Sequence, residues 1–232
     1  MDVVLVPGLW LDGTSWDQVV PGLADAGLRP RAVTLPGMAA PQEDRSAVRL
    51  ADLVAAVVGA IDAADGPVAV VGHSAGAAIA WAAVDARVER VAQVVLVGGF
   101  PVGPGLPPAP DFEVVGSEVP LPPWSQFDEA DLQDMGPERL AVFRQRAIPA
   151  PACVVSDPQQ LSDERRLDVP VTVVCTEFPS AALREWTAQG LPPVQELARI
   201  RSVRLVDLPT GHWPQLTRPV ELAGVIRAAV GS

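Results

Sequence analysis

Ser74 lies between two glycines, where an apolar run gives way to an alanine-rich stretch. Residues 68–72 (VAVVG) follow a Gly-Pro pair and predict a buried strand, while 75–84 contain no proline and predict a helix. A strand that becomes a helix within two residues brings its flanking backbone close together, which explains glycine at positions 72 and 76. The serine then lies on a strained turn with its hydroxyl at the start of a helix, a geometry that suits a nucleophile.

Two other interpretations of this turn need no nucleophile. A glycine turn before a helix can bind a phosphate group, but the dinucleotide pattern G-x-G-x-x-G is absent and the chain has no lysine for a P-loop. An ordinary turn between strand and helix, with glycine only for tight packing, stays open on these five residues alone.

The composition also limits the cofactors. Without lysine, Schiff-base chemistry and a lysine-held pyridoxal group are excluded. His73 and His212 are the only histidines, and no group of histidines and cysteines has the spacing of metal ligands. We therefore expect no cofactor and no metal site.

Segments typical of strands and of helices alternate along the chain. Strands are expected at 3–7, 31–36, 68–72, 91–99, 169–177 and 203–209, and helices around 14–23, 46–64 and 75–84 and after the last two strands. Because the strands are continuous runs of valine and leucine, both faces of the sheet should be covered. The sequence thus predicts an α/β fold with a parallel sheet.

Residues 101–125 interrupt this alternation with eight prolines and three glycines. A helical stretch is expected around 128–148, and nearly seventy residues separate two consecutive strands of the sheet. We expect residues 101–165 to form a lid inserted into a core of 1–100 and 166–232, because Phe112, Leu121, Trp124 and Phe127 are poorly suited to solvent. A solvated proline-rich excursion is the alternative.

The length and the net charge of the chain limit the class of protein to which it can belong. A chain of 232 residues with 49% hydrophobic content predicts one globular domain with a sizeable core. We expect neither a membrane span nor a secretory signal, and the net charge of −11 argues against binding to nucleic acid or to anionic membranes. Because Cys153 and Cys175 make no disulfide framework, we expect a reducing, cytoplasmic location. We also expect a monomer or homodimer that acts on a small molecule.

Four segments resemble the α/β-hydrolase superfamily: VPGLW after the first strand, TLPG after the second, GHSAG around Ser74, and TGHWPQLTRPVELA near the end. Within it, the chain looks like the small esterase branch that is akin to plant-type methylesterases and hydroxynitrile lyases. The resemblance covers nearly all of the chain apart from the lid. It implies a six-stranded parallel sheet in the order 2-1-3-4-5-6, with helices on both faces and a short inserted lid.

The resemblance also implies a catalytic triad. Ser74 matches the nucleophile and His212 the base that activates it. Glu177, which closes the strand at 169–177, is the carboxylate nearest to the position of the family's acid, whereas Glu185 and Asp207 are poorer candidates. A Ser–His dyad without an acid stays open.

The main-chain N–H groups of Leu9 and Ala75 match the family's oxyanion hole, where each donor contributes about 3–4 kcal/mol to the transition state. His73 adjoins the serine and should point away from the reacting atoms. The candidates for substrate contact are Trp10, His73, Trp124 and Trp213. For the tryptophans, a plain role in the core is the alternative.

These residues imply a serine hydrolase that cleaves a small hydrophobic carboxylic ester or thioester through an acyl-enzyme on Ser74. The lid supplies Phe, Leu and Trp side chains, which suit an uncharged substrate. Two alternatives remain: a secondary-metabolism cyclase or lyase that uses the same triad, and a non-catalytic ligand receptor on the same fold. A hydroxynitrile lyase is disfavoured, because those relatives use a lysine of the cap.

Overall fold

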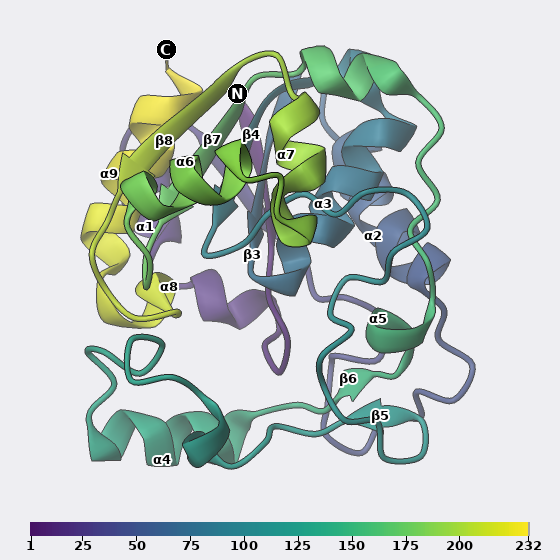
Figure 1. Cartoon of the computed structure of the whole chain (residues 1–232), viewed down its shortest axis with the longest axis vertical. Helices are drawn as coiled ribbons and strands as arrows, with labels where there is room; N and C mark the ends of the chain where they lie inside the picture. The colour runs from purple at the N-terminus through teal and green to yellow at the C-terminus, as the bar shows by residue number, and fades with distance from the viewer. Residues whose placement is uncertain (232) are drawn as a thin grey trace.

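A six-stranded sheet forms the centre of the computed structural model, which describes residues 1–231 (Figure 1). The strands lie in the order β2-β1-β3-β4-β7-β8, and every neighbouring pair is parallel. Their bounds are β1 Asp2–Val6, β2 Arg29–Ala32, β3 Val68–His73, β4 Val91–Val97, β7 Val171–Cys175 and β8 Val203–Asp207. Because β7 and β8 are the fifth and sixth strands of this sheet, the expected order 2-1-3-4-5-6 is confirmed.

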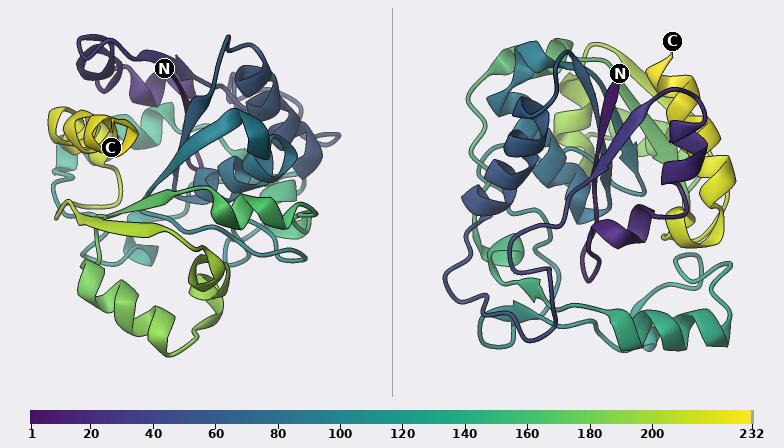
Figure 2. Two further views of the ribbon diagram at one scale, coloured as in Figure 1. Left: turned by 90° about the horizontal axis from the view of Figure 1, so that it is seen from above. Right: turned by 180° about the vertical axis from the view of Figure 1, so that it is seen from behind.

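Helices cover both faces of the sheet, as the sequence predicts. In Figure 2, α1 (Val20–Ala24) and α9 (Pro219–Val230) lie on one side, and α2 (Leu50–Asp62) and α3 (Ala75–Ala86) lie on the other. Every residue of β1, β3 and β7 is buried, and their alternate side chains belong to two separate core clusters. Burial on both faces explains the continuous valine runs of these strands.

Several elements are shorter than the sequence predicts. The helix expected at 14–23 is a 3₁₀ helix, η1 (Gly13–Trp16), followed by the short α1, whose first turn contains Pro21. The stretch expected to be helical at 128–148 is helical only as α4, Pro137–Arg146. Its late start has a local cause, because Asp134 has a left-handed φ of 69° and Gly136 directly precedes the helix. The second strand covers 29–32 rather than 31–36.

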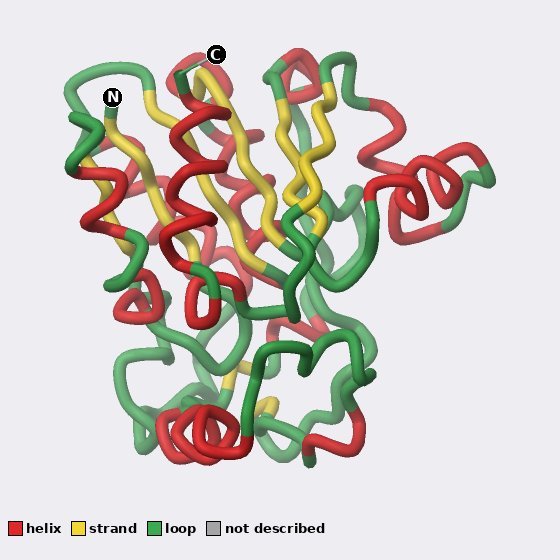
Figure 3. The backbone as a smooth tube through the Cα atoms, turned by 90° about the vertical axis from the view of Figure 1, so that its left-hand side faces the viewer, coloured by secondary structure: helices red, strands yellow, loops and turns green. Residues whose placement is uncertain are grey.

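Residues 101–165 are called the lid segment below, and most of its short elements lie beyond the carboxyl ends of the strands (Figures 1 and 3). Residues 157–165 instead run back along α3, where the main-chain N–H groups of Ser162 and Asp163 donate to Asp85. Two short strands pair antiparallel within the lid segment, and its regular elements are β5 Glu118–Val119, η3 Trp124–Gln126, α4, β6 Ala150–Pro151, α5 Cys153–Ser156 and the start of η4 Glu164–Asp168. The fully buried Arg45 donates a hydrogen bond of 2.7 Å to Oε1 of Glu118 and also bonds to main-chain oxygens at 40, 41 and 43. This side chain ties the lid segment to the loop before α2.

The remaining helices are η2 Val88–Arg90, α6 Ser180–Ala188, η5 Pro192–Val194, α7 Gln195–Arg199 and α8 Pro214–Thr217. A buried polar network joins three of the elements: Arg166 of η4 bonds to Asp85 of α3 and to Glu196 of α7, and the Trp81 indole donates to Glu196. Within residues 1–231, no helix is both long enough and apolar enough to cross a membrane.

Candidate active site

Ser74 lies on the turn between β3 and α3, with a φ of 53° and a ψ of −129°. This conformation is rare for a residue with a Cβ. A Cβ on Gly72 would lie 2.7 Å from the Cα of Ala77, and one on Gly76 would lie 2.3 Å from the main-chain oxygen of Pro7. Both distances are shorter than any ordinary contact, so only glycine fits at these positions. The expected strained turn from strand to helix is present.

Two hydrogen bonds connect Ser74, His212 and Glu177. The Nε2 atom of His212 lies 2.8 Å from Oγ of Ser74, and its Nδ1 atom lies 2.8 Å from Oε1 of Glu177. Because an ionised carboxylate only accepts hydrogen bonds, Nδ1 carries the proton and Nε2 accepts from the serine hydroxyl. The side chains of His212 and Glu177 are only 18% and 15% exposed, so their hydrogen bond is sheltered from bulk water.

The charges of His212 and Glu177 stabilise each other. Burial acts to raise the pKa of Glu177, but the hydrogen bond and the charge of His212, together with the Thr176 hydroxyl, lower that pKa to about 2. Burial acts to lower the pKa of His212, but the hydrogen bond and the charge of Glu177 raise it. The carboxylate is therefore ionised at neutral pH, and its charge stabilises the protonated form of His212 more than water would.

The other two carboxylates considered for the acid bond elsewhere. Asp207 accepts from the main-chain N of Ser180 at 2.6 Å and from its hydroxyl at 2.7 Å, at the start of α6. Glu185 of α6 accepts from the side chain of Gln189, which directly follows this helix. The Thr176 hydroxyl, which the sequence analysis did not include, donates to the second carboxylate oxygen of Glu177. Its position directly before Glu177 is the sequence signal that could have identified it.

Two main-chain N–H groups are available near Ser74. Within residues 1–231, neither the N–H of Leu9 nor that of Ala75 donates a hydrogen bond to a protein group. Both residues also border one small, mostly apolar hollow of about 10 Å³, whose lining does not include Ser74. The N–H of Ala75 is the first of α3, where the helix dipole favours negative charge. Trp10, directly after Leu9, has a left-handed φ of 63°, which is uncommon for a bulky residue.

Substrate contact by His73 stays a prediction, and nothing in the described surroundings of its side chain supports it. Its side chain is fully buried, its Nε2–H donates to the main-chain oxygen of His212 at 2.7 Å, and its Nδ1 accepts from Gln215 at 3.2 Å. Burial and the charge of His212 lower the pKa of His73 to about 3, so the ring stays neutral. The ring supports the His212 loop from behind, which agrees with the expectation that it points away from the reacting atoms.

Aromatic rings of the lid segment pack against the loop that carries His212. The Trp213 ring stands edge-on to the His212 ring, with 5.1 Å between their centroids. Lid rings surround Trp213 and Trp10 with centroid distances of 5.1–6.1 Å, and these rings are Phe112, Trp124, Phe127 and Phe143. Trp10 and Trp213 are 4% and 1% exposed, whereas Trp124 is half-buried. Substrate contact by the three tryptophans stays a prediction.

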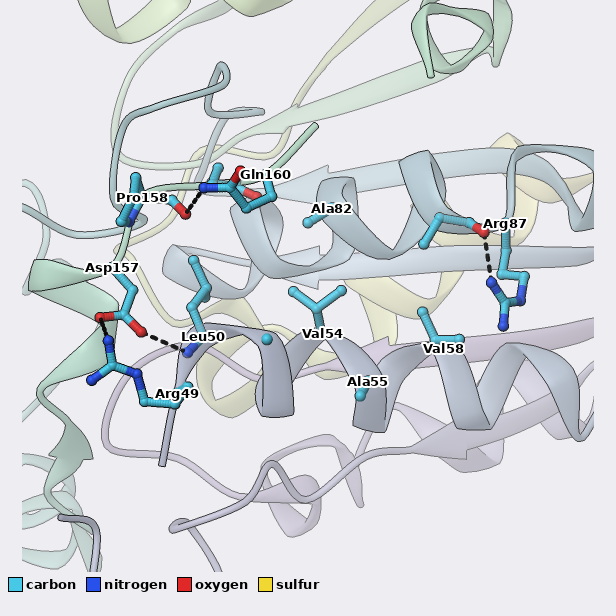
Figure 4. Close-up of a pocket in the computed structure, with 13 residues that line it drawn as sticks. Arg49, Leu50, Val54, Ala55, Val58, Ala82, Arg87, Asp157, Pro158 and Gln160 are labelled. Atoms are coloured by element: carbon cyan, nitrogen blue, oxygen red, sulfur yellow. Dashed lines mark hydrogen bonds and ion pairs between the residues drawn. The ribbon is translucent and has the colours of Figure 1, made fainter. Parts of the chain in front are cut away.

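Two larger hollows lie away from Ser74. One of about 610 Å³ lies between α2, the second half of α3 and residues 157–160 (Figure 4), where Arg49 and Asp157 form an ion pair of 3.0 Å at its edge. The other, of about 670 Å³, lies between residues 10–18 and α4. Neither is lined by Ser74 or His212. Ser74, Glu177 and His212 lie instead after the carboxyl ends of β3, β7 and β8.

The described residues bring together a single group of three potential metal ligands, Asp131, Glu177 and His212. Both imidazole nitrogens of His212 are already bonded, to Ser74 and to Glu177, so neither is left for a metal ion. The donor set does not fit a metal centre, and we assign none.

The model of the family described as "Alpha/beta hydrolase family" matches residues 3–225. No curated protein matches the chain. Among solved structures, it is similar to an extracellular α/β-hydrolase from a Paenibacillus species (17% identity, 99% of this chain and 98% of that one, TM-score 0.80). It is also similar to a methylesterase from Arabidopsis (17%, 100% and 99%, TM-score 0.76) and to a pyrethroid hydrolase from Sphingobium faniae (20%, 100% and 98%, TM-score 0.73). At these identities the likenesses show the fold. Because the family model spans nearly the whole chain, the protein belongs to the α/β-hydrolase family.

Proposed function

We propose that the protein is a serine hydrolase that cleaves small, uncharged carboxylic esters or thioesters through an acyl-enzyme on Ser74. The observation that carries this proposal is the pair of 2.8 Å hydrogen bonds that joins Ser74, His212 and Glu177 on a strained turn of an α/β-hydrolase fold. Fold relatives named as a methylesterase and a pyrethroid hydrolase support the same class of reaction.

In the first half-reaction, the oxygen of Ser74 attacks the carbonyl carbon of the ester and its proton passes to Nε2 of His212. Glu177 holds the Nδ1–H and stabilises the imidazolium that forms. The negative oxygen of the tetrahedral intermediate accepts from the N–H groups of Leu9 and Ala75. His212 then protonates the leaving alcohol or thiol, and the acyl group stays on Ser74.

In the second half-reaction, water gives a proton to Nε2 of His212 and attacks the acyl carbon. Collapse of the second tetrahedral intermediate returns the proton to Ser74 and releases the carboxylic acid. The aromatic rings of the lid segment support a hydrophobic substrate, because they offer an apolar wall at the loop of His212.

Covalent labelling with a fluorescent fluorophosphonate tests the nucleophile, and turnover of p-nitrophenyl acetate and butyrate tests the hydrolysis. We expect one label per chain and ester turnover, both lost in Ser74→Ala, whereas Ser156→Ala, at an exposed serine of the lid segment, keeps both. Labelling that survives in Ser74→Ala would refute the nucleophile. Labelling without ester turnover favours the cyclase or lyase, and the absence of both favours the receptor.

A further inference from the structure

Three hydrogen bonds attach the lid segment to the part of the chain around His212, two to the loop that carries His212 and one to Arg218 before α9. The main-chain N–H of His212 donates to the main-chain oxygen of Asp131 at 2.8 Å. Asp134 accepts from the Thr210 hydroxyl at 3.1 Å and from Nε of Arg218 at 3.2 Å. The backbones are so close that a Cβ on Gly211 would lie 2.5 Å from the main-chain oxygen of Asp131. Residues 131–134 and the His212 loop are therefore held in a fixed relation.

This attachment places a second carboxylate beside the imidazole. An oxygen of the half-buried Asp131 lies within 4.8 Å of a ring nitrogen of His212 and of a carboxylate oxygen of Glu177. The main-chain N–H of Asp128 donates to Oδ2 of Asp131 at 3.0 Å, which fixes the orientation of the side chain. Among the described residues, the titratable groups that face the imidazole are His73 from β3, Glu177 after β7 and Asp131 from the lid segment.

We propose that Asp131 is a positioning residue for His212, through which the lid segment adds a second negative charge beside the imidazolium formed during catalysis. The proposal rests on the proposed function of Ser74 and His212. An opposite charge within about 4–6 Å stabilises the charged form of a titratable group. His73 adds no opposing charge, because it is neutral over the working range of pH.

Asp131 and His212 shift each other's pKa in the directions expected of an ion pair. Burial acts to lower the pKa of His212, and Glu177 and then Asp131 act to raise it. Burial raises the pKa of Asp131, and the charge of His212 opposes that rise. Two carboxylates beside one imidazole also repel a substrate with a negative charge next to the scissile bond. Asp131 thus favours the uncharged esters named above.

A histidine-selective NMR titration tests Asp131 without any substrate. The chain has only two histidines, and the buried His73 stays neutral, so the Cε1 resonance of His212 titrates alone above pH 4. Asp131→Asn keeps the shape of the side chain and the main-chain oxygen that accepts from His212. We expect its His212 midpoint to fall by about one pH unit relative to the wild type. Asp128→Asn, which removes an exposed charge of the same segment, should leave the midpoint unchanged.

The acidic limb of the fluorophosphonate inactivation rate should move by the same amount in Asp131→Asn. An unchanged midpoint in this variant, or an equal fall in Asp128→Asn, would overturn the proposal. Asp131→Ser, whose hydroxyl can still accept from the N–H of Asp128, provides the same comparison if the asparagine variant does not fold. If the phosphonate does not label the wild type, Ser74 is refuted as the nucleophile. The NMR titration of His212 would still decide the role of Asp131.

Discussion

Replacing Glu177 by glutamine tests the member of the triad for which the sequence offered the least support. The variant keeps the length of the side chain and its contact with the Thr176 hydroxyl, but it removes the negative charge 2.8 Å from Nδ1 of His212. The amide can also turn its NH₂ group toward the ring. Nε2 would then carry the proton, and the imidazole could no longer accept from Ser74.

The lowered pKa of Glu177 indicates how far the rate should fall in this variant. The pKa of Glu177 lies at about 2 instead of 4.5, which corresponds to about 3 kcal/mol between its two protonation states. At about 1.4 kcal/mol per tenfold change in rate, a loss of this size in the stabilisation of the imidazolium would slow acylation by roughly 10²-fold. The unfavourable tautomer adds to this, so we expect kcat to fall between about 10²- and 10⁴-fold, the upper value being that of the analogous protease substitution.

The assay compares kcat/KM for p-nitrophenyl butyrate between pH 5 and 9 in three proteins. Glu177→Gln should also move the acidic limb to lower pH, because Glu177 raises the pKa of His212 in the wild type. Asp207→Asn is the matched control: it weakens the hydrogen bonds to Ser180 and should leave the pH profile unchanged. A Glu177→Gln enzyme within a few-fold of the wild type would refute Glu177 as the acid.

Three further outcomes follow from the same contacts. Gly76→Ala should abolish phosphonate labelling or destabilise the fold, because its Cβ would lie 2.3 Å from the Pro7 oxygen. Gly59→Ala in α2, where a Cβ would have no atom within 4 Å, should raise the free energy of unfolding in urea by about 0.5–1 kcal/mol. The depressed pKa of Glu177 stabilises the fold above about pH 4.5 and this contribution is lost toward pH 2, so the difference in Tm between wild type and Glu177→Gln should shrink over that range. Trp124→Ala should change the preference between acetyl and octanoyl esters by about tenfold and keep phosphonate labelling, and an equal loss for all esters would count against selection by the lid segment.

The local geometry around Ser74 was predictable because neighbouring residues determine it. Gly72 and Gly76 flank a serine between a valine run and an alanine run, and the structure has the close backbone contacts that this spacing predicts. The parallel order of the strands was predictable from their continuous burial together with the family resemblance. Glu177 was located from the end of its strand, since parallel strands bring their carboxyl ends to one edge of the sheet.

Contacts that tertiary packing decides were not predictable. Nothing in the pattern around His73 indicates that its two ring nitrogens bond to the main chain of His212 and to Gln215, which lie 139 and 142 residues away. The start of α4 was also missed, because the helical composition before Pro137 is interrupted by the left-handed Asp134. Asp131 had no sequence signal at all, since its carboxylate reaches His212 only when the lid segment folds back over the sheet.

The insertion point of the lid segment explains why it can contact His212. Ser74 follows β3, Glu177 follows β7, and β4 lies between these two strands in the sheet. The lid segment leaves the carboxyl end of β4, and its residues 131–134 bond to Thr210 and His212 at the edge where the serine and the glutamate meet the histidine, before the chain returns to the amino end of β7. The rings that would select the substrate and the carboxylate beside the imidazole are therefore carried by one segment. Substitutions in the lid segment that alter the ester preference by moving its backbone should then also shift the acidic limb, whereas substitutions in the hollow between α2 and α3 should change neither.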